Sequence, residues 1–178
     1  MATATTAHHS PVSAPGGLLA GRGFEFHEIM AGDCTFTDGP IAGRSARVEF
    51  DLRAHAPDLA AFLRKSSGKG VFRTAQLEGS LRIEGIPGDL PASGAIEMNL
   101  VRSRGMMIYD LDFTGPDGKA YHLHGEKHRN WLNFQKGMTT LYTDITEKGS
   151  GKTVGSGILY FDLKTIVPFL RSWKLVRA

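Results

Sequence analysis

The stretch that decides the fold is MMIYDLDFTGPDGKAYHLHGEKH, residues 106–128. Two runs with the alternating pattern of β-strands, Met106–Thr114 and Lys119–His128, flank the sequence Gly-Pro-Asp-Gly at 115–118. Glycine and aspartate tolerate the left-handed backbone that short hairpin loops require. The stretch therefore predicts a β-hairpin.

The second strand of this hairpin has two unlike faces, because side chains alternate between faces along a strand. One row is largely apolar and ends in a lysine, whereas the other is rich in histidine. The rows are Tyr121, Leu123, Gly125 and Lys127, and His122, His124, Glu126 and His128. Every neighbouring strand offers an apolar row to join, so we expect the Lys127 row to face the interior and the histidine row to face solvent.

The same period-two pattern recurs along most of the chain, and it is clearest at Arg44–Ala54. Two segments break it with helical spacing, Pro57–Lys65 and Thr165–Leu170, and Asn130–Lys136 is predicted to be a loop. Further strands are predicted at Gly23–Met30, Val71–Glu84, Gly94–Arg102, Met138–Thr146 and Lys152–Asp162.

An all-β fold with eight or nine antiparallel strands and two short helices follows from this pattern. Consecutive strands joined by short loops leave exposed edges unless the sheet closes. We therefore predict an up-and-down, lipocalin-like β-barrel, with a β-sandwich as the alternative. Gly79 and the Gly-Ser-Gly sequence at 155–157 indicate strong local curvature.

Length and composition are those of one globular domain, which we place at residues 23–178 after a flexible tail at 1–22. No apolar run approaches the roughly 20 residues that span a bilayer, and the tail lacks the pattern of a secretory signal. Cys34 is the one cysteine, so the fold needs no internal disulfide. We expect a cytoplasmic protein without a membrane span.

The charge pattern argues against nucleic-acid binding. The net charge is +3 and the pI is near 9.1, but the basic residues are scattered among acidic ones. A nucleic-acid surface would need a basic stripe with interleaved aromatic residues.

Several short motifs occur in an order that resembles the accessory β-domain of cholesterol-oxidase-like glucose-methanol-choline oxidoreductases. The resemblance runs from about Phe24 to Trp173. Its motifs are Phe26–Gly32, Met107–Phe113, Tyr121–Lys127, Thr139–Tyr142, Gly157–Leu159 and Phe169–Ser172.

This resemblance implies an association with the oxidation of steroids or other lipid-like molecules, and an oxidoreductase or another protein subunit as partner. It supplies no catalytic residues. The dinucleotide-binding pattern G-x-G-x-x-G is absent, so no flavin is expected, and we expect no other cofactor. Self-association into a homo-oligomer is a further alternative.

Lys127 is the most informative residue if its row faces the interior. A lysine inside a barrel must be paired or neutral, because burying an unpaired charge is costly. Glu28 and Asp144 are the candidate partners. The alternative places Lys127 at the barrel rim with its ammonium group in water.

A pocket for a flat apolar ligand could form from aromatic and methionine side chains at strand spacing, although an ordinary core also contains such residues. Each tyrosine would offer one hydrogen bond. The candidate ligand-binding residues are Tyr109, Tyr121, Tyr142 and Tyr160, with Met98, Met107 and Lys127.

The pair His122 and His124 has a spacing that can present two imidazoles to one metal ion, with Glu126 or His128 as further ligands. Ligands along one straight strand cannot all converge on an ion without help from another strand. We therefore favour a solvated histidine face and no metal. Cys34 with His27 or His55 could act as nucleophile and base, but nothing in the sequence places them together.

Three functions are compatible with these residues. The first is a non-catalytic barrel that binds an apolar small molecule such as a steroid, lipid or polyketide. The second is an accessory subunit of an oxidoreductase or another assembly. The third is a small isomerase or cyclase that uses Lys127, a tyrosine and a carboxylate as acid and base.

Overall fold

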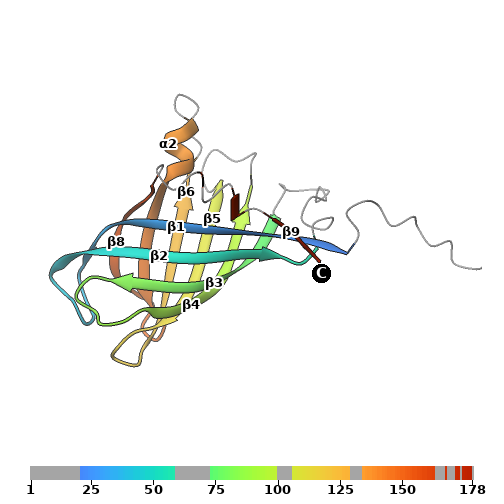
Figure 1. Ribbon diagram of the computed structural model, residues 1–178. Coiled ribbons are helices and arrows are strands. Elements are labelled where there is room, and N and C mark those ends of the chain that lie inside the picture. Colours follow the sequence, from blue (N-terminus) through green and yellow to red (C-terminus); the bar gives the residue numbers. More distant parts are fainter. Residues whose placement is uncertain are drawn as a thin grey trace, which may run out of the picture.

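The computed structural model describes residues 21–58, 73–99, 106–128, 134–162, 167, 171–172 and 174–177 (Figure 1). Antiparallel strands dominate these residues, and one short helix joins them. The strands are β1 (Arg22–Phe36), β2 (Arg44–Ala56), β3 (Arg73–Ile83), β4 (Leu90–Met98), β5 (Met107–Thr114), β6 (Ala120–Lys127), β7 (Thr140–Glu147), β8 (Lys152–Phe161) and β9 (Lys174–Arg177), and the helix is α2 (Phe134–Thr139).

The sheet closes on itself through β1. This strand pairs with β2 from Phe24 to Phe36, and its second half, Met30–Phe36, also pairs with β8. Each of β1 to β8 lies beside its neighbours in sequence, so the strands form an up-and-down barrel. The ninth strand extends the sheet beside the first residues of β1. The predicted barrel is confirmed, and the β-sandwich alternative is wrong.

Period-two rows fill the interior as the sequence predicts. On β2 the inward row is Ala46, Val48, Phe50, Leu52 and Ala54, and all five side chains are buried. On β3 the side chains of Ala75, Leu77, Leu81 and Ile83 are buried as well. Hydrophobic burial of these rows is the main force that holds the barrel together.

The two ends of the barrel differ. At one end short turns connect β1 to β2, β3 to β4, β5 to β6 and β7 to β8. At the other end the connections are longer, and α2 lies there between the end of β6 and the start of β7 (Figure 1). Lys127 is the last residue of β6, so it lies at the end with the long connections.

Several element bounds differ from the prediction. β1 continues to Phe36 rather than ending at Met30, and β4 begins at Leu90, four residues before the predicted Gly94. The helix α2 replaces part of the loop predicted at Asn130–Lys136. The two predicted helices at 57–65 and 165–170, and the tail up to residue 20, lie largely or wholly outside the described residues.

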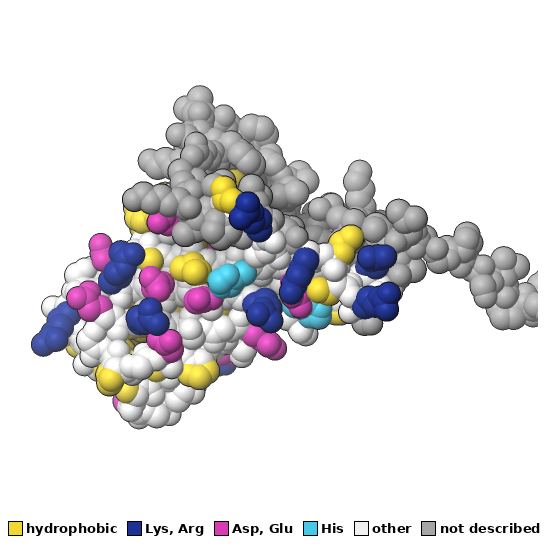
Figure 2. Space-filling model, viewed as in Figure 1, with side chains coloured by type: hydrophobic (Ala, Val, Ile, Leu, Met, Phe, Trp, Pro, Cys, Tyr) yellow, Lys and Arg dark blue, Asp and Glu magenta, His cyan; other side chains and the backbone are white. Residues whose placement is uncertain are grey.

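The surface is polar and mixed in charge. On the face shown in Figure 2, lysine and arginine side chains alternate with aspartate and glutamate, and no basic stripe forms there. Among the described residues, no helix is long and apolar enough to cross a membrane.

Glycines mark the positions where strands bend closely over one another. A Cβ atom added at Gly79 would lie 2.0 Å from the carbonyl oxygen of Asp51 on the neighbouring strand. A Cβ atom at Gly157 would meet backbone and side-chain atoms of Asp33 and Cys34. The register between β7 and β8 shifts next to Gly155. The irregular register next to Gly155 agrees with the curvature predicted at 155–157. At Gly79 the strands are in close contact, and the pairing with both neighbouring strands is regular.

Replacing Gly79 by alanine should destabilise the barrel by about 2 kcal/mol or more, because the added methyl group has to push two strands apart. The matched control is Gly149→Ala in the turn before β8, where the nearest atom lies at an ordinary 3.5 Å. Midpoints of urea unfolding measure both changes. Equal midpoints for the two variants would contradict this account of the close contact at Gly79.

Candidate functional site

Three polar side chains meet inside the barrel. Glu28 comes from β1, Tyr109 from β5 and Lys127 from β6, and we call them the interior trio. The Nζ atom of Lys127 lies 2.7 Å from Oε1 of Glu28, and the hydroxyl group of Tyr109 donates to Oε2 at 2.6 Å. Because β1 lies opposite β5 and β6 in the strand order, these contacts cross the barrel interior.

All three side chains are removed from water. Tyr109 is 1% exposed, Lys127 2% and Glu28 5%. An ion pair in such a place has to offset the cost of desolvating both charges, which needs good geometry and further hydrogen bonds. Here each carboxylate oxygen accepts one hydrogen bond, and the ammonium group also lies 5.1 Å from the centre of the Tyr109 ring.

The environment of Tyr109 keeps its phenol protonated. Burial raises the pKa of its phenol well above the ordinary value, and the charge of Glu28 and the hydrogen bond to it raise the pKa further. The phenol therefore acts as a hydrogen-bond donor rather than as an acid.

The prediction that Lys127 faces the interior is confirmed. The side chain points into the barrel and pairs with Glu28, one of its two candidate partners, rather than lying at the rim in water. The other candidate, Asp144, is exposed on the outer face of β7.

The other predicted ligand-binding residues fall into three groups. Met98, Met107 and Lys127 are register neighbours across β4, β5 and β6, so both methionines lie near the trio. Met98 is buried, and Met107 is partly buried against the core. Tyr121 is also inside, but near the opposite end of the barrel.

Tyr142 and Tyr160 require a correction. Both side chains lie on the outside of the barrel, 47% and 52% exposed. The alternation along each strand explains this, because Leu141 and Leu159 are the residues that point inward. The two tyrosines therefore cannot line an interior pocket.

Tyr121 belongs to a group of apolar side chains, with Phe36, Ile83, Leu90 and Phe113, at the end of the barrel that has the short turns. Its hydroxyl group donates to Asp117 at 2.8 Å, and its ring stacks on Phe113. A partly open cavity of about 20 Å³ lies beside Tyr121, which is room for about one water molecule. Side chains such as Phe36, Ile83 and Leu90 complete its lining. This end of the barrel is closed by its own core.

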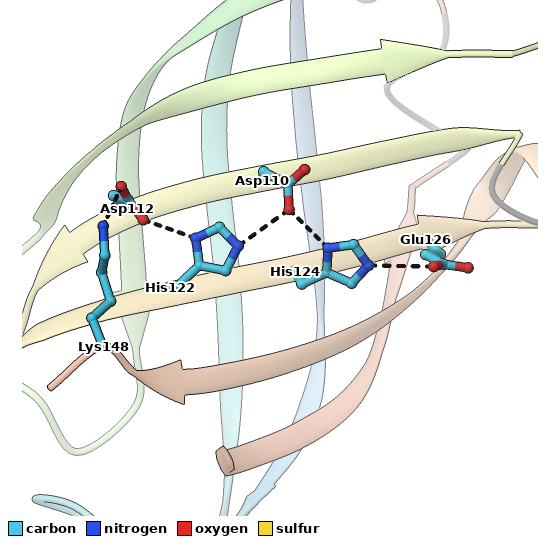
Figure 3. Close-up of polar contacts among 6 residues, drawn as sticks. All are labelled: Asp110, Asp112, His122, His124, Glu126 and Lys148. Atoms are coloured by element: carbon cyan, nitrogen blue, oxygen red, sulfur yellow. Dashed lines mark hydrogen bonds and ion pairs between the residues drawn. The ribbon is translucent and has the colours of Figure 1, made fainter. Parts of the chain in front are cut away.

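A second polar cluster lies on the outer face of the hairpin that β5 and β6 form (Figure 3). We call it the outer histidine row, and its members are Asp110, Asp112, His122, His124 and Glu126. The register of the hairpin places Asp110 opposite His124 and Asp112 opposite His122. The side chains of His122 and His124 are 34% and 41% exposed, as expected for the solvent face.

Asp110 is the centre of this row. Its Oδ1 atom lies 3.2 Å from Nε2 of His122 and 2.8 Å from Nδ1 of His124. The other ring nitrogen of each histidine also contacts a carboxylate. Nδ1 of His122 lies 2.8 Å from Asp112, and Nε2 of His124 lies 3.3 Å from Glu126.

The charges around His124 change its titration. Partial burial lowers the pKa of its imidazole, but hydrogen bonds and attraction from Asp110 and Glu126 outweigh burial and raise the pKa overall.

The sequence prediction did not include Asp110, since its role depends on the pairing of two strands. The turn at 115–118 was the available signal, because it fixes which residues face each other.

Cys34 does not pair with His27 or His55, the two histidines considered as its base. Its side chain is fully buried, and burial raises the pKa of the thiol to about 11. His27 faces outward and pairs with Asp51. His55 also lies on the outer surface, in a polar depression of about 140 Å³ with Glu25 and other polar side chains.

Replacing Lys127 by methionine should lower the free energy of unfolding by about 3 kcal/mol or more, because the Glu28 carboxylate then stays buried without its cation. The double variant Glu28→Gln, Lys127→Met should recover most of this loss. Urea unfolding of both variants and of Glu28→Gln gives the coupling between the two sites. Additive effects would mean that the pair does not interact in solution.

Cys34 should resist a disulfide reagent such as dithionitrobenzoate at neutral pH in the folded protein and react fully in urea. Both the raised pKa and the burial of the thiol keep it from forming an accessible thiolate. Absorbance of the released thiolate measures the reaction. Rapid labelling of the folded protein would contradict the burial of Cys34.

Comparison with known proteins adds no relative: no family model, no curated protein and no solved structure matches this chain. The resemblance to the accessory domain of glucose-methanol-choline oxidoreductases therefore stays a prediction from the sequence.

Proposed function

We propose that this barrel binds an apolar small molecule that carries one polar group, at the end where the interior trio lies. The observation that carries the proposal is the buried ammonium group of Lys127. An ammonium group has three N–H donors, and within the described residues it has one hydrogen-bond acceptor, Glu28. A polar atom of a ligand would supply a further acceptor.

The surroundings of the trio suit an apolar ligand body. Phe26 and Met30 flank Glu28 on the inward face of β1, and both are buried. The ring of Phe50 stacks on Tyr109 with 5.9 Å between ring centres. Small-molecule sites combine apolar side chains with a few polar groups that fix the orientation of the ligand, and the trio with its apolar neighbours has this composition.

Binding fits the trio better than acid–base catalysis does. Tyr109 holds its proton too tightly to donate it readily, and Lys127 is engaged with Glu28. A general acid or base works best with a pKa near the working pH. Steroids, fatty acids and polyketides with a carbonyl, hydroxyl or carboxylate group are the ligand classes that match the donor of Lys127.

An accessory role is the second candidate function, and exposed aromatic residues favour it. Tyr142 and Tyr160 are both about half exposed. Tyr142 is paired with Ile158, so the two tyrosines are diagonal neighbours on the outer face of β7 and β8. Exposed aromatic side chains of this kind are enriched where proteins associate.

Native mass spectrometry of the protein purified from its own source is the first test. An adduct with the mass of a lipid or steroid supports the proposed binding function, and a co-purifying polypeptide supports the accessory role.

Fluorescence titration with cis-parinaric acid, with progesterone as competitor, tests the site itself. The double variant Glu28→Gln, Lys127→Met should bind at least tenfold more weakly than the wild type, since a hydrogen bond to a charged group contributes about 1.5–3 kcal/mol. Lys119→Met is the matched control, because Lys119 is an exposed lysine on the same hairpin. Equal affinities for the double variant and the wild type would overturn the assignment of the site.

A further inference from the structure

We propose that Asp110, His122 and His124 bind a divalent transition-metal ion, Zn²⁺ in the first place, on the outer face of β5 and β6. The three ligand atoms all lie within 4.8 Å of one another. Zinc bonds of about 2.0–2.2 Å place tetrahedral ligand atoms about 3.4 Å apart. The oxygen of Asp110 already lies 3.2 Å and 2.8 Å from the two nitrogens, so small side-chain rotations suffice.

Ligands from one straight strand cannot all converge on an ion, but the hairpin brings in a ligand from a second strand. His122 and His124 project from the same face of β6, and β5 adds a carboxylate between them (Figure 3). The backbone pairing of Asp110 with His124 fixes this arrangement. Two imidazole nitrogens and one carboxylate oxygen form a ligand set that zinc sites use, with water in the remaining position.

The outer contacts of both histidines match the surroundings of metal ligands. A histidine that binds a metal through one nitrogen almost always donates its other N–H to a carboxylate, carbonyl or water, which fixes the ring. Asp112 and Glu126 are placed for this role on His122 and His124, respectively. Lys148 in turn holds Asp112 through a contact of 2.7 Å.

The local charge favours a cation. Asp110, Asp112 and Glu126 lie around the two imidazoles, and Asp144 is the register partner of His124 on β7. In the part of the chain that the structure describes, two side chains that can carry positive charge contact this group, Lys148 through Asp112 and His128 through Glu126 at 2.9 Å. An ion with water in its remaining positions would join β5 to β6 and stabilise the folded state.

Isothermal titration of the full chain with ZnCl₂ tests the proposal. The chain should carry no affinity tag, and His8→Gln with His9→Gln removes the two adjacent histidines near the N-terminus. We expect one ion per chain in this background and a rise in the midpoint of thermal unfolding with zinc. The absorption spectrum with Co²⁺ reports the geometry of the site.

Variants of the row assign the site. His122→Gln and His124→Gln should each abolish measurable binding, whereas Asp112→Asn and Glu126→Gln should weaken it about 10–100-fold. His27→Gln and His55→Gln are matched controls on the outer face of β1 and β2, and they should bind as the background does. Circular dichroism checks that each variant is folded.

The proposal is overturned if zinc does not bind, or if the double variant His122→Gln, His124→Gln binds as tightly as the background does. Binding that disappears with His27→Gln or His55→Gln would also overturn it. The outcome is independent of the interior site, because titration with cis-parinaric acid reports that site separately.

Discussion

Closure of the sheet through β1 is the constraint on which the rest of the structure depends. Because this strand pairs with β2 and with β8, every inward side chain of the eight barrel strands shares one enclosed interior. Closure brings Glu28 across the barrel to Tyr109 and Lys127, although these residues are distant in sequence. The β5–β6 hairpin is a single layer, with Tyr109 and Lys127 on its inner face and the outer histidine row on its outer face. One hairpin thus contributes to two polar clusters that are separated by the thickness of a sheet.

Much of the assignment of side chains to the inner or the outer face could be predicted from the alternation of apolar and polar residues along each strand. The apolar rows of β2 and β3 assign the inner and outer faces of those strands. On β6, Lys127 shares a row with Tyr121 and Leu123, and this row is placed inward because the neighbouring strands offer apolar rows for it to join. The need for a carboxylate partner followed from physical chemistry, because a buried ammonium group is costly unless it is paired. Glu28 and Asp144 were both candidates, although alternation with Leu141 and Ile145 places Asp144 on the outer row of β7. The contact between Glu28 and Lys127 itself depends on β1 lying across the barrel from β6.

Other features depend on pairing that no single strand reveals. β1 continues beyond Met30 through Gly32 and Asp33, residues with low strand propensity, because partners on both sides stabilise it. Pro91 indicates a loop, yet it lies second in β4, near a strand start where a missing N–H is tolerated. Tyr142 and Tyr160 were expected in a pocket on grounds of residue type, but their position along the strand decides their side.

The last strand has a consequence for how this domain can be combined with others. β9 pairs with the first residues of β1, and Arg177 is the register partner of Arg22. The first and the last strand of the described chain, β1 and β9, are therefore adjacent at residues 22 and 177. A domain with neighbouring ends can be inserted into a surface loop of another protein, or circularly permuted, without stretching either chain.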